Sequence, residues 1–260
     1  MNQSQHNDPS RSSCRASIVV PCYNEAKRLN IAAFHEFLQR PESIRLVFVD
    51  DGSSDATLDV LRRLCTGFES RTDILQCPLN VGKAEAVRRG LLHAIQHFDS
   101  EIVGYWDADL ATPLDAISRF LHVLDTHPEI AMIFGSRVKL LGRYVKRRPR
   151  RHYLGRVFAT VVSQILRLPI YDTQCGAKLF RVDSGIREIL AAPFLSKWIF
   201  DVEIIARYLQ RHGGDPAYLE AAIYEYPLER WEDVAGSKVR SKDFLIAFAD
   251  VLRIRAKYLR

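Results

Sequence analysis

The sequence predicts an α/β fold built on a mostly parallel β-sheet with helices on both faces. Short apolar runs alternate along the chain with amphipathic segments of helical length, a pattern typical of βαβ units. Polar residues of the kind that bind ligands follow each of the first four apolar runs. With 260 residues, 47% of them hydrophobic, the chain is long enough to bury the core of one large domain.

Five apolar runs fit strands, and the segments between them carry apolar residues at the three- and four-residue spacing of helices. The predicted strands are Ser17–Val20, Leu46–Val49, Ile74–Gln76, Ile102–Trp106 and Ala131–Gly135. The predicted helices lie near Ile31–Gln39, Ala56–Phe68, Ala84–Phe98 and Leu114–Asp125. Farther along, we expect a helix at Tyr153–Leu166, a turn and strand at Asp172–Phe180, a helix at Phe200–Arg211, a strand at Ala221–Tyr226 and a final helix at Phe244–Leu259.

Composition excludes several classes of protein. Charged residues interrupt every apolar stretch before it reaches the roughly 20 residues that span a bilayer. Met1 to Arg15 is polar and lacks the apolar core of a signal peptide, so we expect a disordered tail there. The five cysteines are odd in number and never spaced as Cys-x-x-Cys, which argues against a disulfide framework or a zinc site and favours a reducing, cytoplasmic setting.

Positive charge is concentrated in one segment. The net charge is +6, yet the segment from Arg137 to Arg156 holds nine Lys or Arg and no acid, so the rest of the chain is net negative. Such a segment is either a solvated loop or a site for a polyanion such as phosphate, nucleic acid or an anionic membrane. We expect it to be a mobile loop that closes over anionic ligands.

The loops after the first four strands form the strongest functional signal. They are Pro21 to Glu25, Asp50 to Asp55, Asn80 to Lys83, and Asp107 to Asp109. Each loop alone is explained equally well by a turn or a helix cap. Because the carboxyl ends of parallel strands meet at one edge of a sheet, the four together predict a nucleotide site.

The residue types in these loops suggest a chemistry. The carboxylates of Asp107 and Asp109 are hard oxygen ligands suited to Mg²⁺ or Mn²⁺, which neutralises diphosphate oxygens. Asp50 and Asp51 can accept hydrogen bonds from a base or a ribose, and Lys83 can add positive charge near phosphates. The sequence lacks the glycine-rich signatures of ATP-hydrolysing loops and of dinucleotide-binding folds.

Taken together, these motifs resemble those of the family 2 inverting glycosyltransferases of GT-A fold, which have a Rossmann-like sheet. The resemblance covers roughly Ala16 to Leu259. Later motifs are similar to the dolichyl-phosphate β-glucosyltransferase branch and its prokaryotic polyprenyl-phosphate relatives. These motifs are Leu110 to Pro113, Gly135 to Arg137, Asp172 to Phe180, Phe200 to Glu203, and Trp231 followed by Gly236 to Lys238.

The resemblance implies a nucleotide-sugar donor, usually UDP-glucose, a polyprenyl phosphate acceptor and a divalent metal. It places Pro21, Tyr23, Glu25 and Asp51, with Asp50 beside them, at the nucleoside. It places Lys83 and Asp107 at the base, ribose and sugar, and the metal at Asp109 with Asp107. It directs Arg137, Arg151 and Lys238 to the phosphates. With the tail and the final helix read from composition, we expect three parts of the chain: the disordered tail 1–15, a GT-A domain 16–236 and a basic amphipathic helix 237–260.

The chemistry of the acceptor fits the residues present. A phosphate is already ionised near neutral pH, so positioning and charge stabilisation can suffice without a general base. None of the eight histidines falls in the strand-end loops. Asp172 and Asp201 stay open as contacts to sugar hydroxyls, as a base, or as caps of a turn or helix.

Contact with a lipid substrate has to come from somewhere other than the tail. Members of the branch commonly carry an amino-terminal membrane helix, and Met1 to Arg15 cannot form one. We expect a peripheral protein at the cytosolic membrane face, held there by the 237–260 helix or by an integral-membrane partner. That helix can equally pack on the sheet by its apolar stripe.

Two alternative functions stay open. The first is a dolichyl-phosphate mannose synthase that uses GDP-mannose. The second is a non-catalytic nucleic-acid-binding protein, supported only by the cationic segment 137–156. Since no nucleic-acid fold signature accompanies that segment, we expect no nucleic-acid partner.

Overall fold

The structure is a computed structural model that describes residues 13–146, 149–234 and 241–259, with the backbone alone at 13, 149–152 and 241–245. Its strands are β1 (Ser13–Cys22), β2 (Ile44–Asp50), β3 (Thr72–Gln76), β4 (Asp99–Trp106), β5 (Met132–Ser136), β6 (Tyr144–Lys146), β7 (Ala177–Arg181), β8 (Ile223–Pro227) and β9 (Arg230–Glu232). Its helices are α1 (Ile31–Leu38), α2 (Thr57–Cys65), α3 (Lys83–His97), α4 (Asp115–Thr126), α5 (Pro149–Leu166), α6 (Ser184–Ala191), α7 (Phe200–Arg211), α8 (Pro216–Ala222) and α9 (Ser241–Tyr258).

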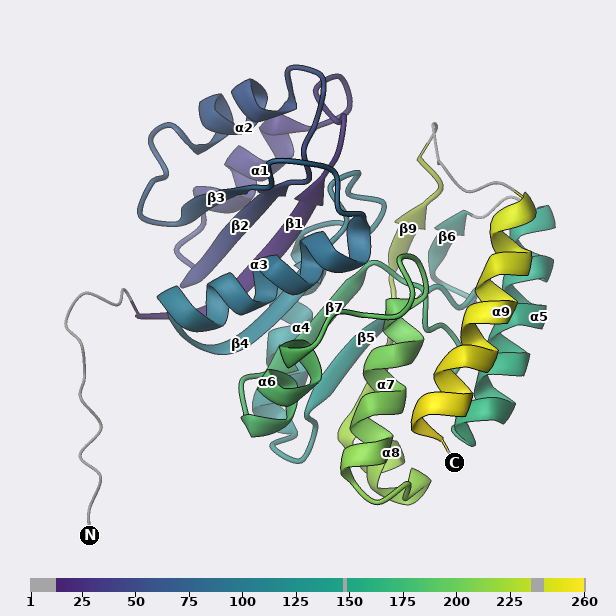
Figure 1. The fold of residues 1–260 in the computed structure, drawn as a ribbon. Helices are drawn as coiled ribbons and strands as arrows, with labels where there is room; N and C mark the ends of the chain where they lie inside the picture. The colour runs from purple at the N-terminus through teal and green to yellow at the C-terminus, as the bar shows by residue number, and fades with distance from the viewer. Residues whose placement is uncertain (1–12, 147–148, 235–240, 260) are drawn as a thin grey trace, which may run out of the picture.

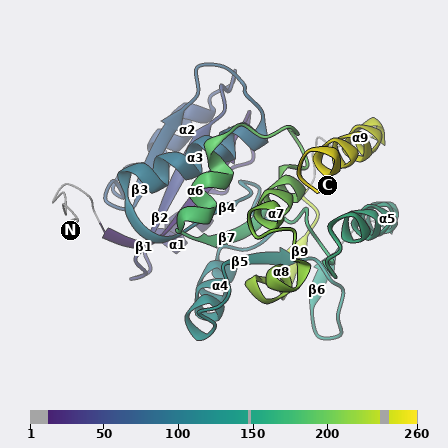
Figure 2. The same ribbon diagram turned by 60° about the horizontal axis from the view of Figure 1, so that its bottom comes forward.

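A seven-stranded sheet of order β3-β2-β1-β4-β7-β5-β8 forms the centre of the molecule (Figure 1). Neighbouring strands are parallel except at β7, which runs antiparallel to both β4 and β5. β6 and β9 form a separate parallel pair. Figure 2 shows helices on both sides of the sheet. The predicted fold class, a mostly parallel sheet with helices on both faces, is confirmed.

The two faces of the sheet bury two separate cores, and the alternation of side chains along each strand assigns residues to one or the other. In β1, Val19 packs toward α3, α6 and α7, whereas Ile18 and Val20 pack toward α1, α2 and α4. Because central strands are covered on both faces, they read in the sequence as continuous apolar runs. This explains why apolar runs located the strands correctly.

Four short elements and the start of the first strand differ most from the sequence prediction. β6, β9, α6 and α8 were not predicted. Asp183 and Asp215 cap α6 and α8 by accepting from Ile186 and Ala217 N–H groups. β1 begins at Ser13, so the end of the segment that we assigned to a disordered tail belongs to a strand, where Cys14 is buried.

The carboxyl-terminal helix α9 packs into the same core as the sheet. Its Ala247, Val251 and Ile254 are buried, and Phe248 contacts Phe158 of α5 with ring centroids 5.5 Å apart. Of the two interpretations left open for this helix, the packed apolar stripe therefore describes one of its faces. α5 and α9 lie side by side along one side of the molecule (Figure 1).

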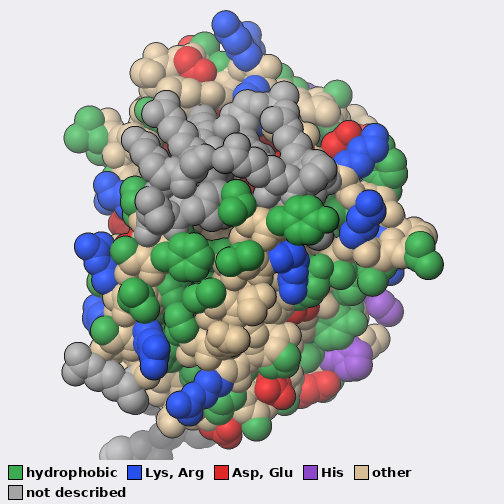
Figure 3. Space-filling view, turned by 90° about the vertical axis from the view of Figure 1, so that its right-hand side faces the viewer, with side chains coloured by type: hydrophobic (Ala, Val, Ile, Leu, Met, Phe, Trp, Pro, Cys, Tyr) green, Lys and Arg blue, Asp and Glu red, His purple; other side chains and the backbone are tan. Residues whose placement is uncertain are grey.

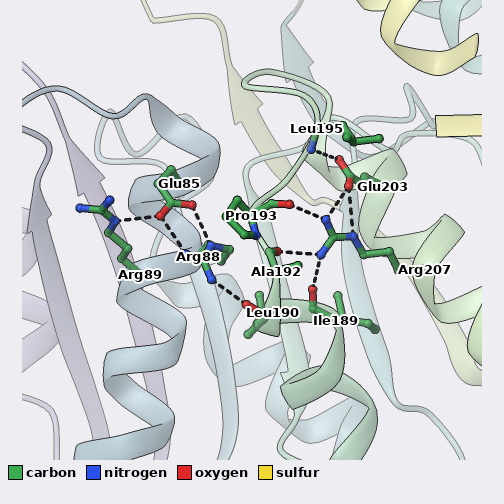
Figure 4. Close-up of polar contacts among 10 residues, drawn as sticks. All are labelled: Glu85, Arg88, Arg89, Ile189, Leu190, Ala192, Pro193, Leu195, Glu203 and Arg207. Carbon is green, nitrogen blue, oxygen red and sulfur yellow. Dashed lines mark hydrogen bonds and ion pairs between the residues drawn. The ribbon is translucent and has the colours of Figure 1, made fainter. Parts of the chain in front are cut away.

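A buried ion pair on α7 fixes the connection between α6 and α7 (Figure 4). Glu203 is fully buried and accepts from Arg207 Nη2 at 2.6 Å and from the Leu195 N–H at 2.7 Å. Arg207 in turn donates to three backbone carbonyls, those of Ile189, Ala192 and Pro193. A buried charge pair whose hydrogen bonds are satisfied in this way specifies the path of the loop that it holds.

This ion pair yields a stability prediction. Arg207→Met should lower the free energy of unfolding by about 3–5 kcal/mol, because it leaves the Glu203 carboxylate buried without its cation. Chemical denaturation followed by circular dichroism measures the change. Arg211→Met, one turn later on α7, breaks an exposed hydrogen bond to Ser184 and a partly exposed pair with Glu188, and should cost less than about 1 kcal/mol. Equal losses in the two variants would contradict the structural role assigned to Glu203 and Arg207.

Candidate active site

Four of the predicted loops meet at one edge of the sheet. β1, β2 and β4 are parallel neighbours, so their carboxyl ends lie together, with Cys22 opposite Asp50. β7 is antiparallel, so its first residue, Ala177, pairs with Trp106 at the end of β4. The chain builds β2 and β3 on one side of β1 and then crosses to β4 on the other. Open α/β sheets bind ligands at such a switch point.

Asp107 and Lys83 form an ion pair at this edge. Lys83 Nζ lies 2.6 Å from Asp107 Oδ1. Burial alone would lower the pKa of Lys83, but the charge and hydrogen bond of Asp107 outweigh it and the pKa is raised. Lys83 therefore stays protonated and brings a cation to the predicted phosphate position. The Asp107 carboxylate fits only because residue 176 is glycine, since a Cβ there would lie 1.9 Å from Oδ2.

Asp109 follows in a tight turn. The Asp107 carbonyl accepts from the Leu110 N–H at 3.1 Å, and Leu110 has a φ of 52°. The Asp109 carboxylate accepts from the Ala111 N–H at 3.1 Å and lies 3.8 Å from Arg28 Nη2. Burial and the neighbouring Asp107 charge raise the pKa of Asp109. Because the negative charges of Asp107 and Asp109 repel each other in a partly buried site, a bound cation would stabilise both.

Asp51 organises the loop that precedes α3. Its carboxylate accepts from Val81 N–H at 2.7 Å and Gly82 N–H at 3.0 Å, and also from the Asn80 side chain. Burial raises the pKa of Asp51 against the lowering effect of the two N–H groups. Gly52 is required because its φ is 63° and a Cβ would lie 2.4 Å from the Leu79 carbonyl carbon. A nucleoside role for Asp51 stays a prediction.

The remaining predicted nucleoside residues surround the same loops. Pro21 lies in β1 beside β2, and Tyr23 is exposed at 37%. Glu25 Oε1 lies 3.3 Å from Arg28 Nη1. The Asp50 carboxylate is buried and accepts from the Ser53 N–H at 3.2 Å. These residues are brought together as predicted, and their contacts to a nucleoside stay a prediction.

Arg137 is held at the end of β5 by Asp172. Its Nε and Nη2 donate to the two oxygens of that carboxylate at 2.6 and 2.7 Å, and its guanidinium lies over the Trp231 ring. Although burial would lower it, the pKa of Arg137 is raised by the Asp172 charge. Glu225 accepts from the Tyr171 and Asp172 N–H groups, each at 2.7 Å. Asp172 thus orients an arginine.

Asp201 belongs to a buried cluster beneath Lys83. Lys178 is fully buried, and its Nζ lies 2.9 Å from Asp201 Oδ1. The same oxygen accepts from the Tyr105 hydroxyl, and burial with the nearby Asp201 charge raises the pKa of Tyr105. Lys83 Nζ lies over the Tyr105 ring, 6.0 Å from its centroid. Asp201 is therefore the counter-ion of a buried lysine.

Two predicted phosphate ligands lie outside what the structure describes. Lys238 falls among the undescribed residues 235–240, and Arg151 has only its backbone described, in α5. Their roles stay predictions.

The cationic segment 137–156 is more ordered than we predicted. Among its described parts, residues 144–146 form β6, paired with β9, and α5 begins at residue 149. A mobile loop is therefore wrong for these parts. Acids from elsewhere offset the charge, because Arg143 Nη1 lies 3.0 Å from Glu229 and Lys146 Nζ lies 3.6 Å from Glu232.

Sequence reasoning assigned no role to four residues that shape the site, although two of them lie in the motif from Asp172 to Phe180: Arg28, Gly176, Lys178 and Glu225. Lys178 had a usable signal, since a lone lysine inside the apolar run Ala177–Phe180 has to find a buried partner. Arg28 and Glu225 had none, because the partners that bring them to the site, Asp109 and the N–H groups of residues 171 and 172, are distant in the sequence.

A family comparison decides the class of enzyme. The profile of "Glycosyl transferase family 2" matches residues 17–185. The chain belongs to this family. It is 32% identical over 265 residues to a dolichyl-phosphate beta-glucosyltransferase of Saccharomyces cerevisiae, covering 94% of this chain and 75% of the yeast protein. A dolichyl-phosphate beta-glucosyltransferase of Trichomonas vaginalis is 30% identical over 249 residues, which cover 92% of this chain and 72% of that protein. The chain is accordingly a glycosyltransferase.

Solved structures of other glycosyltransferases share the fold. A mannosyltransferase from Pyrobaculum calidifontis, in complex with GDP-Man and Mn²⁺, superposes with a TM-score of 0.60 at 22% identity and covers 96% of this chain, which spans 65% of that one. Glucosyl-3-phosphoglycerate synthase from Mycobacterium tuberculosis, in complex with UDP, has a TM-score of 0.60 at 17% identity and covers 94% of this chain, which spans 80% of the synthase. These likenesses confirm the GT-A fold.

The contact at Gly176 gives a prediction for the site. Gly176→Ala should lower transfer activity roughly a hundredfold, because the Cβ displaces the Asp107 carboxylate and a misplacement of about 1 Å is costly in an active site. Steady-state kinetics and thermal unfolding measure the two effects separately. Gly135→Ala is the matched control, since its Cβ would meet Cys175 Sγ at 3.0 Å but not Asp107. Equal losses in both variants would indicate general crowding.

Proposed function

We propose that this glycosyltransferase inverts the anomeric carbon as it transfers glucose from UDP-glucose to a dolichyl or other polyprenyl phosphate. The observation that carries the proposal is the meeting of Asp107, Asp109 and Lys83 at the switch point of the sheet. The similarity to dolichyl-phosphate beta-glucosyltransferases over more than nine-tenths of the chain supports the choice of substrates.

Asp107 and Asp109 would hold a Mg²⁺ or Mn²⁺ ion. Their donor set is chemically suitable, because it consists of carboxylate oxygens and leaves positions for diphosphate oxygens. The described residues contain no group of three or more His, Cys, Asp or Glu that could hold a metal without the donor. A bound ion would supply neutralisation of charge on the leaving diphosphate, and Lys83 supplies a second positive charge beside it.

The acceptor phosphate would act as its own nucleophile. The two carboxylates that we considered as bases both have other partners, Asp172 with Arg137 and Asp201 with Lys178 and Tyr105. An ionised phosphate oxygen needs no base to attack the anomeric carbon, and the nucleoside diphosphate leaves from the opposite face. Arg137, oriented by its two hydrogen bonds to Asp172, would stabilise phosphate charge.

The side formed by α5 and α9 would face the membrane. In Figure 3, apolar side chains gather on this side with Lys and Arg among them. Its exposed apolar residues include Tyr153, Val157, Ile246 and Leu252, and the Arg253 side chain is 73% exposed. Each basic residue near an anionic surface contributes about 1 kcal/mol. Among the described helices, none has the length and apolar character to cross a bilayer.

A panel assay tests the proposed function directly. The protein is incubated with UDP-glucose, GDP-mannose and other nucleotide sugars, each with Mg²⁺ or Mn²⁺ and a polyprenyl phosphate, and the glycolipid is identified by mass spectrometry. Glucosyl transfer from UDP-glucose supports the proposal. Transfer only from GDP-mannose would replace it with a mannose synthase, and no transfer to a polyprenyl phosphate would reject the acceptor class.

The metal role of Asp109 is tested by one substitution. Asp109→Asn should abolish metal-stimulated transfer while leaving thermal unfolding unchanged, because an amide offers a divalent cation one neutral oxygen in place of an anionic one. Activity is measured across a Mn²⁺ titration. Asp115→Asn, at the start of α4 and paired with Arg40, serves as the control and should keep wild-type activity. An Asp109→Asn enzyme within twofold of wild type would remove the metal role from this residue.

Comparing a free polyprenol with its phosphate ester as acceptor tests whether the nucleophile has to be an already ionised oxygen. A free polyprenol should yield no glycolipid under conditions in which its phosphate ester reacts, because the alcohol needs a base and the nearby carboxylates are engaged in ion pairs. Product is followed by radiolabelled glucose transfer. Efficient glucosylation of the alcohol would bring Asp172 or Asp201 back as the base.

A further inference from the structure

The loop that connects α6 to α7 lies beside the loop of Gly82 and Lys83 at the proposed donor site. We call residues 193–198 the lip. A Cβ built on Gly82 would lie 3.8 Å from the Lys197 side chain. The next residue along, Lys83, makes the ion pair with Asp107. The lip therefore contacts the residue that precedes Lys83, next to the predicted phosphate position, although more than 100 residues separate Lys197 from Gly82 in the sequence.

The lip is fixed in place by buried polar groups. The Glu203 carboxylate accepts from the Leu195 N–H, and Arg207 donates to the Pro193 carbonyl (Figure 4). Ser196 is buried, and its hydroxyl donates to Asp250 of α9 at 2.8 Å and accepts from the Ile199 N–H at 3.0 Å. These bonds constrain the lip from both α7 and α9.

The side chains that the lip exposes are of two kinds. Leu195 and Trp198 are 43% and 41% exposed, and Lys197 between them is exposed as well. Their neighbours Ser196 and Ile199 are buried. Holding large apolar groups outward on a fixed loop leaves apolar surface in water, which is unfavourable unless a ligand covers it.

We propose that the lip is the contact for the first isoprene units of the lipid acceptor, with Leu195 and Trp198 against the hydrocarbon and Lys197 beside the phosphate. This inference rests on the proposed function and adds a subsite to it. A cation flanked by two apolar side chains complements a phosphate joined to a hydrocarbon chain. A nucleotide would use the cation but leave both apolar groups uncovered.

The position of the lip fits a substrate that comes from a membrane. Through the bond from Ser196 to Asp250, the lip is joined to α9, whose Ile246 and Leu252 are exposed. On its other side it adjoins the Gly82 and Lys83 loop. A lipid phosphate drawn from the surface of α5 and α9 toward Asp107 would meet the lip on the way.

Steady-state kinetics with the lipid acceptor test the assignment. Trp198→Ala and Leu195→Ala should each raise the KM for a long polyprenyl phosphate in detergent about tenfold, as expected for loss of an apolar anchor, with the KM for UDP-glucose unchanged. The control is Tyr218→Ala, because Tyr218 is equally exposed at 42% but lies on α8, beyond the far end of α7. The KM values of Tyr218→Ala for the polyprenyl phosphate and for UDP-glucose should equal those of wild type.

Binding measurements give a readout that does not depend on turnover. Trp106 and Trp231 are buried, so Trp198 is the exposed tryptophan of the three in the chain. Citronellyl phosphate should shift its fluorescence to shorter wavelength, and inorganic phosphate and phospholipid vesicles free of polyprenyl phosphate should not. Trp198→Phe should lose the shift, which assigns the signal to this tryptophan. A shift with vesicles alone would assign the lip to the bulk membrane and overturn the proposal.

The failure of this inference can be told from failure of the proposed function. If wild-type protein transfers no sugar to any polyprenyl phosphate and citronellyl phosphate gives no shift, both are rejected. If wild type transfers glucose but Trp198→Ala and Leu195→Ala leave the acceptor KM unchanged, the lip is rejected alone. Thermal unfolding of each variant excludes misfolding as the cause of a raised KM.

Discussion

Four of the carboxylates at or beneath the edge of the sheet each pair with a cation, and the arrangement of the site depends on these pairs. The pairs are Asp107 with Lys83, Asp109 with Arg28, Asp172 with Arg137, and Asp201 with Lys178. Partly buried carboxylates without partners would take up protons and lose the charge that a divalent cation needs. The pairing orients both the acids and the bases before any ligand binds. It also separates roles, because Asp107 and Asp109 face the predicted donor while Asp201 holds Lys178 in the core.

The sequence predicted the sheet and its long helices because their signals are local. A buried strand reads as an apolar run and an amphipathic helix repeats every three to four residues, so neither needs a distant partner to be recognised. β6 and β9 have three residues each and exist only because they pair with each other. No periodicity can show such a pair. The helices α6 and α8 are short too, although Asp183 and the Asp215-Pro216 pair are cap signals that the sequence shows.

In the candidate site, too, local features could be predicted from the sequence and distant contacts could not. Loops that follow strands were predictable, since parallel topology alone brings Asp50, Lys83 and Asp107 together. The partners of individual side chains were not. Asp172 was considered as a base, but its position opposite Arg137 makes it a positioning group. The positive charge of segment 137–156 was counted within one window, whereas Glu229 and Glu232 lie far away in the sequence. Charge counted along a chain misses neutralisation across the fold.

Glu203 connects α9, on the side proposed to face the membrane, to the edge of the site. Its carboxylate binds the lip through Leu195, pairs with Arg207 of α7, and accepts from the Tyr258 hydroxyl of α9 at 3.1 Å. A buried charge bonded to three elements cannot release one without losing a hydrogen bond in a medium of low dielectric. The lip, α7 and the end of α9 are therefore held as a unit. A helix that touches a membrane through Leu252 would then set the distance between the lipid surface and Asp107, because the elements between them are fixed to one another.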